Sequence, residues 1–187
     1  MLITIARKCG CRGDEIGNAL AEKYGIPFYN KEKSLQLARE NGLTEKYPDF
    51  YGEIPMNTLL YTISEEERIS AQTPKKALSN LLGEKDCIVL GRCGNYAFRD
   101  REDVLSIFLT GDDEAREEQI AKKHDISKKK AHELVMRTDE RRRAYHRYYT
   151  GEEWGLADYY DLCLNVTEMG VEGTLRIIDA YWKEKHK

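Results

Sequence analysis

The chain has 187 residues and a formal net charge of −3 at pH 7, with 41% hydrophobic and 34% charged residues. That length predicts one domain with one core, and no apolar run reaches the roughly 18 residues that a membrane-spanning helix requires. The small negative charge gives no general attraction to nucleic acid, so an anion site has to be a local cluster of basic residues. A short apolar start and an odd number of cysteines favour a reduced, cytoplasmic setting over secretion.

The first part of the chain reads as a strand, a glycine loop, a helix and a second strand. Leu2–Ala6 is a short apolar run of β-forming residues, and Gly10 and Gly13 interrupt the pattern that follows it. A helical stripe of apolar residues then ends at Gly25, and Ile26–Tyr29 is expected to be the next strand. This order is typical of the start of a parallel α/β fold.

Three further strands are expected in the rest of the chain, at Cys87–Leu90, Val104–Leu109 and Leu162–Val166. Each is a nearly continuous apolar run, which favours parallel strands covered by helices on both faces. A last helix is predicted from about Val171. We therefore expect an α/β protein with a parallel sheet, and we expect Leu2–Ala6 to be its central strand.

Two segments fit this pattern less well. Residues 31–73 lack a clear strand and are expected to form a partly helical insertion, whereas residues 112–150 read as charged helices with few apolar anchors. Insertions that lie over the carboxyl ends of a parallel sheet are where a substrate crevice forms.

The loop between the first strand and the first helix carries candidate phosphate ligands. Backbone N–H groups at a helix start can hold phosphate, and the candidates here are Arg7, Lys8, Gly10, Cys11, Arg12 and Gly13. The full G-x-x-x-x-G-K-[ST] pattern is absent, because Gly13 stands in the place of the lysine and an acidic residue in the place of the hydroxyl. A plain tight turn is the alternative. Cys9 and Cys11 have no second Cys or His pair at ligand spacing, so these residues predict no metal site.

Several stretches, taken in order, resemble the cytidylate-kinase-like family. They are Ile3–Arg7 with the glycines after it, Glu15–Gly17, Gly25–Tyr29, Val89–Tyr96, Val104–Leu109 with Arg116, Thr138–Gly155, Tyr160–Asn165 and Gly170–Gly173. The resemblance covers nearly the whole chain and is weakest over residues 33–73. It implies a single P-loop kinase-like domain over residues 1–187, with a three-layer P-loop NTPase fold. The insertion at about residues 31–73 would bind the nucleoside monophosphate, and residues 112–150 would form a lid-like segment.

The resemblance also implies an activity, namely phosphoryl transfer from ATP to a nucleoside monophosphate such as CMP. ATP and Mg²⁺ would be the cofactors and a small-molecule nucleotide the partner; neither nucleic acid nor a membrane is expected, and the oligomeric state stays open. The family usually reads G-S-G-G-R-E-I in the loop, whereas this chain has Arg12 for a glycine and Asp14 for the arginine, and Asn30 replaces an acid after the second strand. A catalytically impaired nucleotide-binding or regulatory protein is therefore the alternative, and a kinase for another small phosphate acceptor is a third hypothesis.

Arginines outside the loop are the candidate catalytic residues, because phosphoryl transfer depends on positioning and positive charge. Arg92 follows a predicted strand, and by resemblance it would hold the phosphate of the acceptor. Arg137 and Arg141 can share a helix face, and by resemblance they would close over the phosphates. Asp139 would orient an arginine or contact the base. The alternatives are a surface ion pair for Arg92 and a solvated, ion-paired helix for the others.

Overall fold

A five-stranded parallel sheet lies at the centre of the computed structural model, which describes residues 1–52 and 66–185, with side chains from residue 71 in the second range. The strand order is β2-β3-β1-β4-β5. The strands are β1 (Leu2–Arg7), β2 (Phe28–Tyr29), β3 (Cys87–Leu90), β4 (Val104–Thr110) and β5 (Leu162–Asn165). Because β1 pairs in parallel with both β3 and β4, the predicted central position of the first strand is confirmed.

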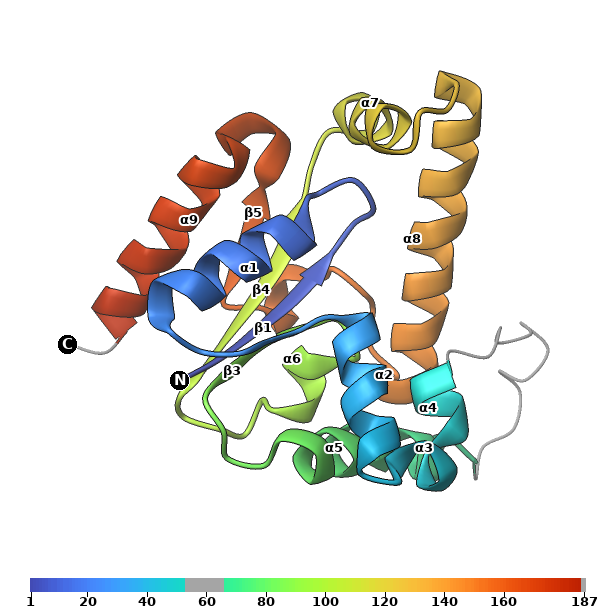
Figure 1. Ribbon diagram of the computed structural model, residues 1–187, viewed down its shortest axis with the longest axis vertical. Helices are drawn as coiled ribbons and strands as arrows, with labels where there is room; N and C mark the ends of the chain where they lie inside the picture. The colour runs from blue at the N-terminus through green and yellow to red at the C-terminus, as the bar shows by residue number, and fades with distance from the viewer. Residues whose placement is uncertain (53–65, 186–187) are drawn as a thin grey trace.

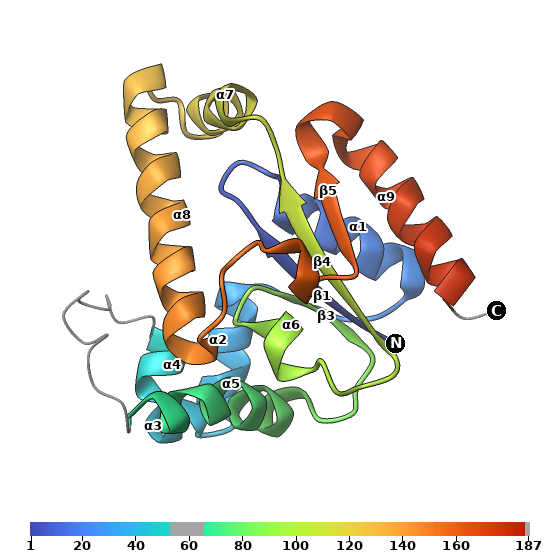
Figure 2. The same cartoon turned by 180° about the vertical axis from the view of Figure 1, so that it is seen from behind.

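Helices cover both faces of the sheet, as the sequence predicted (Figures 1 and 2). On one face, Ile3 and Ile5 pack with α1 (Gly13–Tyr24) and α9 (Val166–Lys185). On the other face, Leu2 belongs to a core that includes residues of α5 (Glu66–Leu82) and α6 (Gly94–Ala97). Neighbouring residues of β1 therefore point into different cores, as the period of two in a strand requires.

The segment after β2 is helical where the structure describes it. It contains α2 (Lys31–Glu40), α3 (Leu43–Lys46) and α4 (Pro48–Gly52), so the helical structure expected for this part is confirmed. Residues 53–65 of the predicted insertion lie outside the described residues. Phe50 and Tyr51 of α4 are buried against the sheet-side core and α5, so this insertion is packed onto the domain.

Residues 112–150 form two charged helices, as predicted. They are α7 (Asp113–His124) and α8 (Lys128–Thr150), and their apolar anchors Ile120 and Val135 pack around Cys9 of the glycine loop. Both helices lie beyond the carboxyl ends of β1 and β4 (Figure 1). The last helix, α9, starts earlier than predicted, with a break at Gly170 immediately before the expected start. Among the described residues, none of the helices is long and apolar enough to cross a membrane.

Candidate phosphoryl-transfer site

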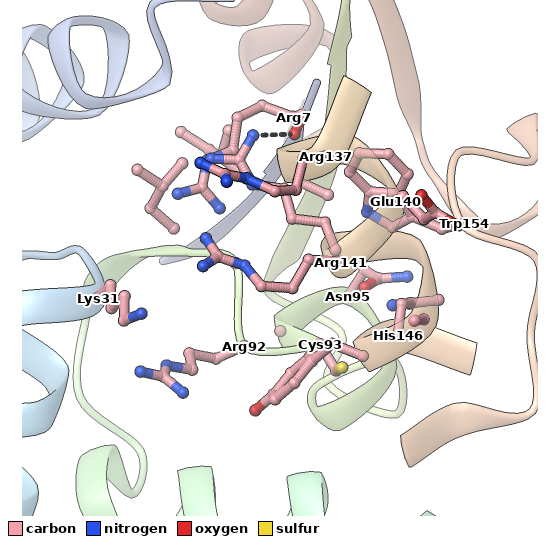
Figure 3. A pocket seen from close by; sticks show the side chains of 18 residues that line it. Arg7, Lys31, Arg92, Cys93, Asn95, Arg137, Glu140, Arg141, His146 and Trp154 are labelled. Carbon is pink, nitrogen blue, oxygen red and sulfur yellow. Dashed lines mark hydrogen bonds between the residues drawn. The ribbon is translucent and has the colours of Figure 1, made fainter. Parts of the chain in front are cut away.

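Two adjoining pockets lie at the carboxyl edge of the sheet. The larger has a volume of about 490 Å³ and is lined by the ends of β1 and β3, by α6 and by α8 (Figure 3). The smaller has a volume of about 280 Å³ and is lined by the glycine loop, the start of α1 and α7. Arg7 and Arg142 line both pockets, so these two side chains stand at their junction.

All six candidate phosphate ligands line the smaller pocket, namely Arg7, Lys8, Gly10, Cys11, Arg12 and Gly13. Gly10 (φ +85°) and Arg12 (φ +51°) are left-handed, and Arg12 caps α1 without a side-chain hydrogen bond to the helix start. The first N–H groups of a helix have no partner within the helix, and Gly13, Asp14 and Glu15 of this first turn line the pocket. The loop therefore presents backbone donors to the smaller pocket.

The side chain of Arg7 runs between the glycine loop and the end of β3. A Cβ atom added to Gly13 would lie 3.0 Å from Cγ of Arg7, and one added to Gly91 would lie 2.7 Å from its Nη1. Glycine at both positions makes room for this arginine, and Gly91 is also left-handed, with φ +82°. Arg7 is thus held at the junction of the two pockets.

Two further charged residues, Arg12 of the loop and Asp14 of the first turn of α1, have hydrogen-bond partners within the protein. Arg12 donates to Glu15 through Nε at 2.8 Å and Nη2 at 2.6 Å, so its guanidinium lies along α1 at the mouth of the smaller pocket. Asp14 accepts a hydrogen bond from Asn30 at 3.0 Å. Burial raises the pKa of the Cys11 thiol to about 12, so this side chain is a neutral packing group rather than a thiolate.

Arg92 lines the larger pocket from the end of β3, but its guanidinium also holds the insertion. Only 5% of the residue is exposed, which is inconsistent with a surface ion pair. Its Nη1 and Nη2 donate to the main-chain oxygens of Phe50 and Tyr51, at 2.5 and 3.1 Å. The hydroxyl of Tyr145 on α8 donates to the same Phe50 oxygen at 2.9 Å. The strand end, the insertion and α8 therefore meet at one carbonyl group.

Helix α8 supplies most of the remaining positive charge of the larger pocket. The described lining contains six cationic side chains and one carboxylate, Glu140. In Figure 3, Lys31 and Arg92 lie on one side, Arg141 in the middle, and Trp154, Asn95 and His146 on the other. The cationic residues are Arg7, Lys31, Arg92, Arg137, Arg141 and Arg142. The pocket thus has a positively charged side and a side with an aromatic ring and neutral polar groups.

Asp139 does not line either pocket as the structure describes them. Its Oδ1 accepts from the N–H of Cys9 at 2.6 Å, and its Oδ2 accepts from Nη1 of Arg116 at 2.8 Å. Both carboxylate oxygens are thus engaged within the protein, and the contact with a base that the sequence suggested for Asp139 stays a prediction. Pairing with arginine does occur, with Arg116 of α7 at 2.8 Å and, at 3.9 Å, with Arg142 of the predicted basic segment.

Several pocket residues were not candidates from the sequence, namely Lys31, Asn95, His146 and Trp154. Lys31 begins α2 two positions after the last residue of β2, and a basic residue close to a strand end was an available signal for it. His146 and Trp154 lie within the aromatic and basic stretch of residues 138–155. There the sequence predicted packing onto the core, and Trp154 does pack against Phe108 of β4.

Burial of His146 predicts a pH dependence of stability. Burial, and then the nearby Arg99, lower the pKa of this imidazole from 6.5 to about 4. Between these values the unfolded chain binds a proton that the folded protein does not, so stability is lost as the pH falls from about 6.5 to about 4. A His146→Gln variant should reduce the slope of unfolding free energy against pH in that window by up to about 1.4 kcal/mol per pH unit. Urea unfolding at a series of pH values measures this slope, and equal slopes in the two proteins would contradict a neutral buried imidazole.

The sheet order, the glycine loop between β1 and α1, and the arginine-lined pockets at the carboxyl edge define an α/β protein of the P-loop kinase type. Solved structures share this fold. An uncharacterized protein from Eubacterium ventriosum is 24% identical with a TM-score of 0.73, and the match covers 98% of both chains. Shikimate kinase from Bacteroides thetaiotaomicron is 12% identical with a TM-score of 0.55, again over 98% of both chains.

A gluconokinase from Sinorhizobium meliloti is 14% identical with a TM-score of 0.53, over 98% of this chain and 94% of its own. The protein belongs to the cytidylate kinase-like family, whose model matches residues 2–168. This membership confirms the resemblance found in the sequence. A comparison with curated proteins gives no match.

Proposed function

We propose that this protein is a kinase that transfers a phosphoryl group from ATP to a nucleoside monophosphate such as CMP. The observation that carries the proposal is the pair of adjoining pockets with Arg7 and Arg142 at their junction. A kinase needs two anion sites that meet where the phosphoryl group passes, and it needs fixed positive charge at that point. The smaller pocket is assigned to the donor phosphates and the larger to the acceptor.

In this assignment the transfer proceeds at the junction. A phosphate oxygen of the acceptor attacks the γ-phosphorus, the bond from that phosphorus to the bridging oxygen of ADP breaks, and the acceptor leaves as a diphosphate. Arg7 and Arg142 stabilise the charge on the transferring group, and Nη1 of Arg142 also donates to the main-chain oxygen of Arg7 at 3.1 Å (dashed line in Figure 3). Bidentate guanidinium groups suit this task.

The remaining residues of the larger pocket bind and orient the acceptor. Arg137, Arg141 and Lys31 attract its phosphate, and Trp154 offers an apolar surface to its base. Arg92 keeps the insertion in place through the carbonyl groups of α4 and adds positive charge at the same wall. These roles develop those that the sequence gave to Arg92, Arg137 and Arg141.

The residues at the smaller pocket are compatible with Mg²⁺ bound together with the donor phosphates. Mg²⁺ favours oxygen ligands and is commonly held by one or two carboxylates plus phosphates. Asp14 and Glu15 are the carboxylates that line this pocket, although Glu15 pairs with Arg12 and Asp14 with Asn30. The metal would supply further charge neutralisation, and one of these carboxylates would exchange its present partner for it.

The pairing of Arg12 with Glu15 also supports a second candidate, a nucleotide-binding protein with weak or no transfer. Gly13 provides no ammonium group at the lysine position, and Arg12 is turned toward Glu15 along α1. In this case the two pockets bind nucleotides but the junction stabilises the transition state poorly. In that case Arg7 and Arg142 are the cationic side chains that the described structure places at the junction to neutralise the transferring group.

A coupled assay that detects ADP, with ATP and CMP, dCMP, UMP or AMP, distinguishes these candidates. Binding is measured in parallel from the fluorescence of Trp154, in a Trp182→Phe variant that leaves this tryptophan as the only reporter. Turnover with CMP supports the kinase. Binding of nucleotide without turnover supports the second candidate, and no binding of any nucleotide, with or without Mg²⁺, contradicts both.

A further inference from the structure

Arg116 and Asp139 form a buried pair beside the glycine loop and outside the described lining of both pockets. Arg116 is 3% exposed and Asp139 is 7% exposed. Nη1 of Arg116 lies 2.8 Å from Oδ2 of Asp139, and Nη2 lies 2.5 Å from Oδ1 of Asp113. A buried ion pair is weak evidence for a stabilising role, because its desolvation offsets much of the attraction. The position of the pair in the fold therefore says more about its role than its contribution to stability does.

The pair holds both main-chain groups of Cys9. The N–H of Cys9 donates to Oδ1 of Asp139 at 2.6 Å, and its carbonyl oxygen accepts from Nη1 of Arg116 at 2.9 Å. These contacts join residues 130 and 107 positions apart in the chain. Cys9 is the residue before Gly10, so the contacts fix the loop next to the donors of the smaller pocket.

Two further contacts extend the same arrangement. A Cβ atom added to Gly10 would lie 2.6 Å from the carbonyl oxygen of Arg116, so the loop also touches the main chain of α7. Arg142, at the junction of the pockets, lies 3.9 Å from Oδ1 of Asp139 on the same helix. The loop, α7 and the junction arginine thus meet at one buried cluster.

We infer that Arg116 and Asp139 are positioning residues that clamp the main chain of Cys9 and make the glycine loop and helix α8 move as one unit. The clamp occupies the N–H of Cys9, so an anion in the smaller pocket binds the donors that follow it, at the start of α1. Its effect on the donor nucleotide rests on the proposed function, whereas its effect on the loop does not. Loss of the clamp loosens the loop without removing any group that lines the pockets.

Hydrogen exchange of the Cys9 amide tests the clamp directly. The variants are Asp139→Asn, Arg116→Met and the double variant, and folding of each is checked by thermal unfolding. Asp139→Asn replaces the charged acceptor of the Cys9 amide by a neutral one, and Arg116→Met removes the charged donor to the Cys9 carbonyl group. Exchange of the Cys9 amide should therefore rise by about 10- to 100-fold in each single variant. Exchange in β1 and β3 should change far less. Because the two residues act together, the double variant should exceed the larger single effect by less than about threefold.

A matched pair at the opposite end of the sheet serves as the control. Arg101 donates to Asp103 at 2.8 and 2.7 Å, next to the start of β4 and outside the described lining of both pockets. Arg101→Met and Asp103→Asn should lower stability without changing exchange of the Cys9 amide. If they raise it as much as the clamp variants do, the effect is general destabilisation and the inference is wrong.

Kinetics then separate the clamp from the proposed function. In an active enzyme, the clamp variants should raise KM for ATP by about tenfold or more, and Kd for CMP from Trp154 fluorescence should change by less than about threefold. Inactivity of the parent protein with every nucleotide counts against the proposed function alone, since the exchange result still decides the clamp. Unchanged exchange in folded Asp139→Asn protein overturns the clamp even if the enzyme is active, and this conservative variant carries the test if Arg116→Met does not fold.

Discussion

Replacement of Arg7 by alanine is expected to lower kcat by about 10²- to 10³-fold, the usual loss when one charge-stabilising group is removed from a transition state. Arg7 is held between Gly13 and Gly91, lines both pockets, and is the loop residue whose guanidinium reaches the junction. It is therefore our choice for the charge that lysine supplies in the full P-loop pattern. Arg7→Lys should recover part of the loss, because it keeps the charge and loses the planar fork.

Arg12→Ala is the matched control for this prediction. Arg12 is in the same loop and carries the same charge, but it pairs with Glu15 at the mouth of the smaller pocket. We expect its removal to change kcat by less than about threefold, since an exposed ion pair contributes little. Steady-state rates with saturating ATP and CMP measure both variants. Equal losses at the two positions would show that Arg7 has no special place at the junction.

Gly10→Ala is expected to destabilise the protein by about 3 kcal/mol or more, because left-handed strain and overpacking add at this position. Gly10 has φ +85°, and a new Cβ would lie 2.6 Å from the carbonyl oxygen of Arg116 and 2.9 Å from its Cβ. The first atom belongs to the main chain of α7 and cannot move aside as a flexible side chain would. The loop would have to separate from α7, and ATP binding should weaken with it.

Gly25→Ala isolates the strain from the contact. Gly25 ends α1 with φ +65°, and no heavy atom lies within 4 Å of an added Cβ in the described structure. Only the left-handed conformation then opposes alanine, so a loss of about 1–2 kcal/mol is expected. Urea unfolding of both variants gives the difference, provided that the m-values agree. Similar losses at Gly10 and Gly25 would be evidence against a tight contact between the loop and α7.

The fold was largely predictable because its strands are marked by their composition. Cys87–Leu90 was predicted with the bounds of β3, since all its residues are apolar and buried. The second strand was predicted to begin at Ile26 but begins at Phe28, since Pro27 precedes it and has no N–H to donate to the ladder. The break at Gly170 in α9 depends on a local left-handed conformation that periodicity does not reveal.

From spacing alone, the candidate site was predictable only where its residues are close in sequence, whereas Arg92, Arg137 and Arg141 of the larger pocket were found through the family resemblance. Gly10, Cys11, Arg12 and Gly13 share a pocket because they share a loop between a strand and a helix. The partners of Arg92 are carbonyl oxygens of α4, and a carbonyl group has no signature in the sequence. Asp139 and Cys9 are 130 positions apart in the chain, and they meet because the fold brings α8 against the glycine loop. The direction in which the side chains of Arg92 and Asp139 point could therefore not be predicted from sequence spacing.

Because Arg7 and Arg142 line both pockets, a ligand in one pocket affects the binding of a ligand in the other. An anion bound in either pocket neutralises part of the charge on Arg7 and Arg142, so it weakens the attraction of those arginines for an anion in the other. By thermodynamic linkage this antagonism is the same in both directions. A single molecule that joins a nucleoside to a polyphosphate across the junction would occupy both pockets with one association step. A covalently linked bisubstrate compound is therefore a suitable inhibitor scaffold for this site.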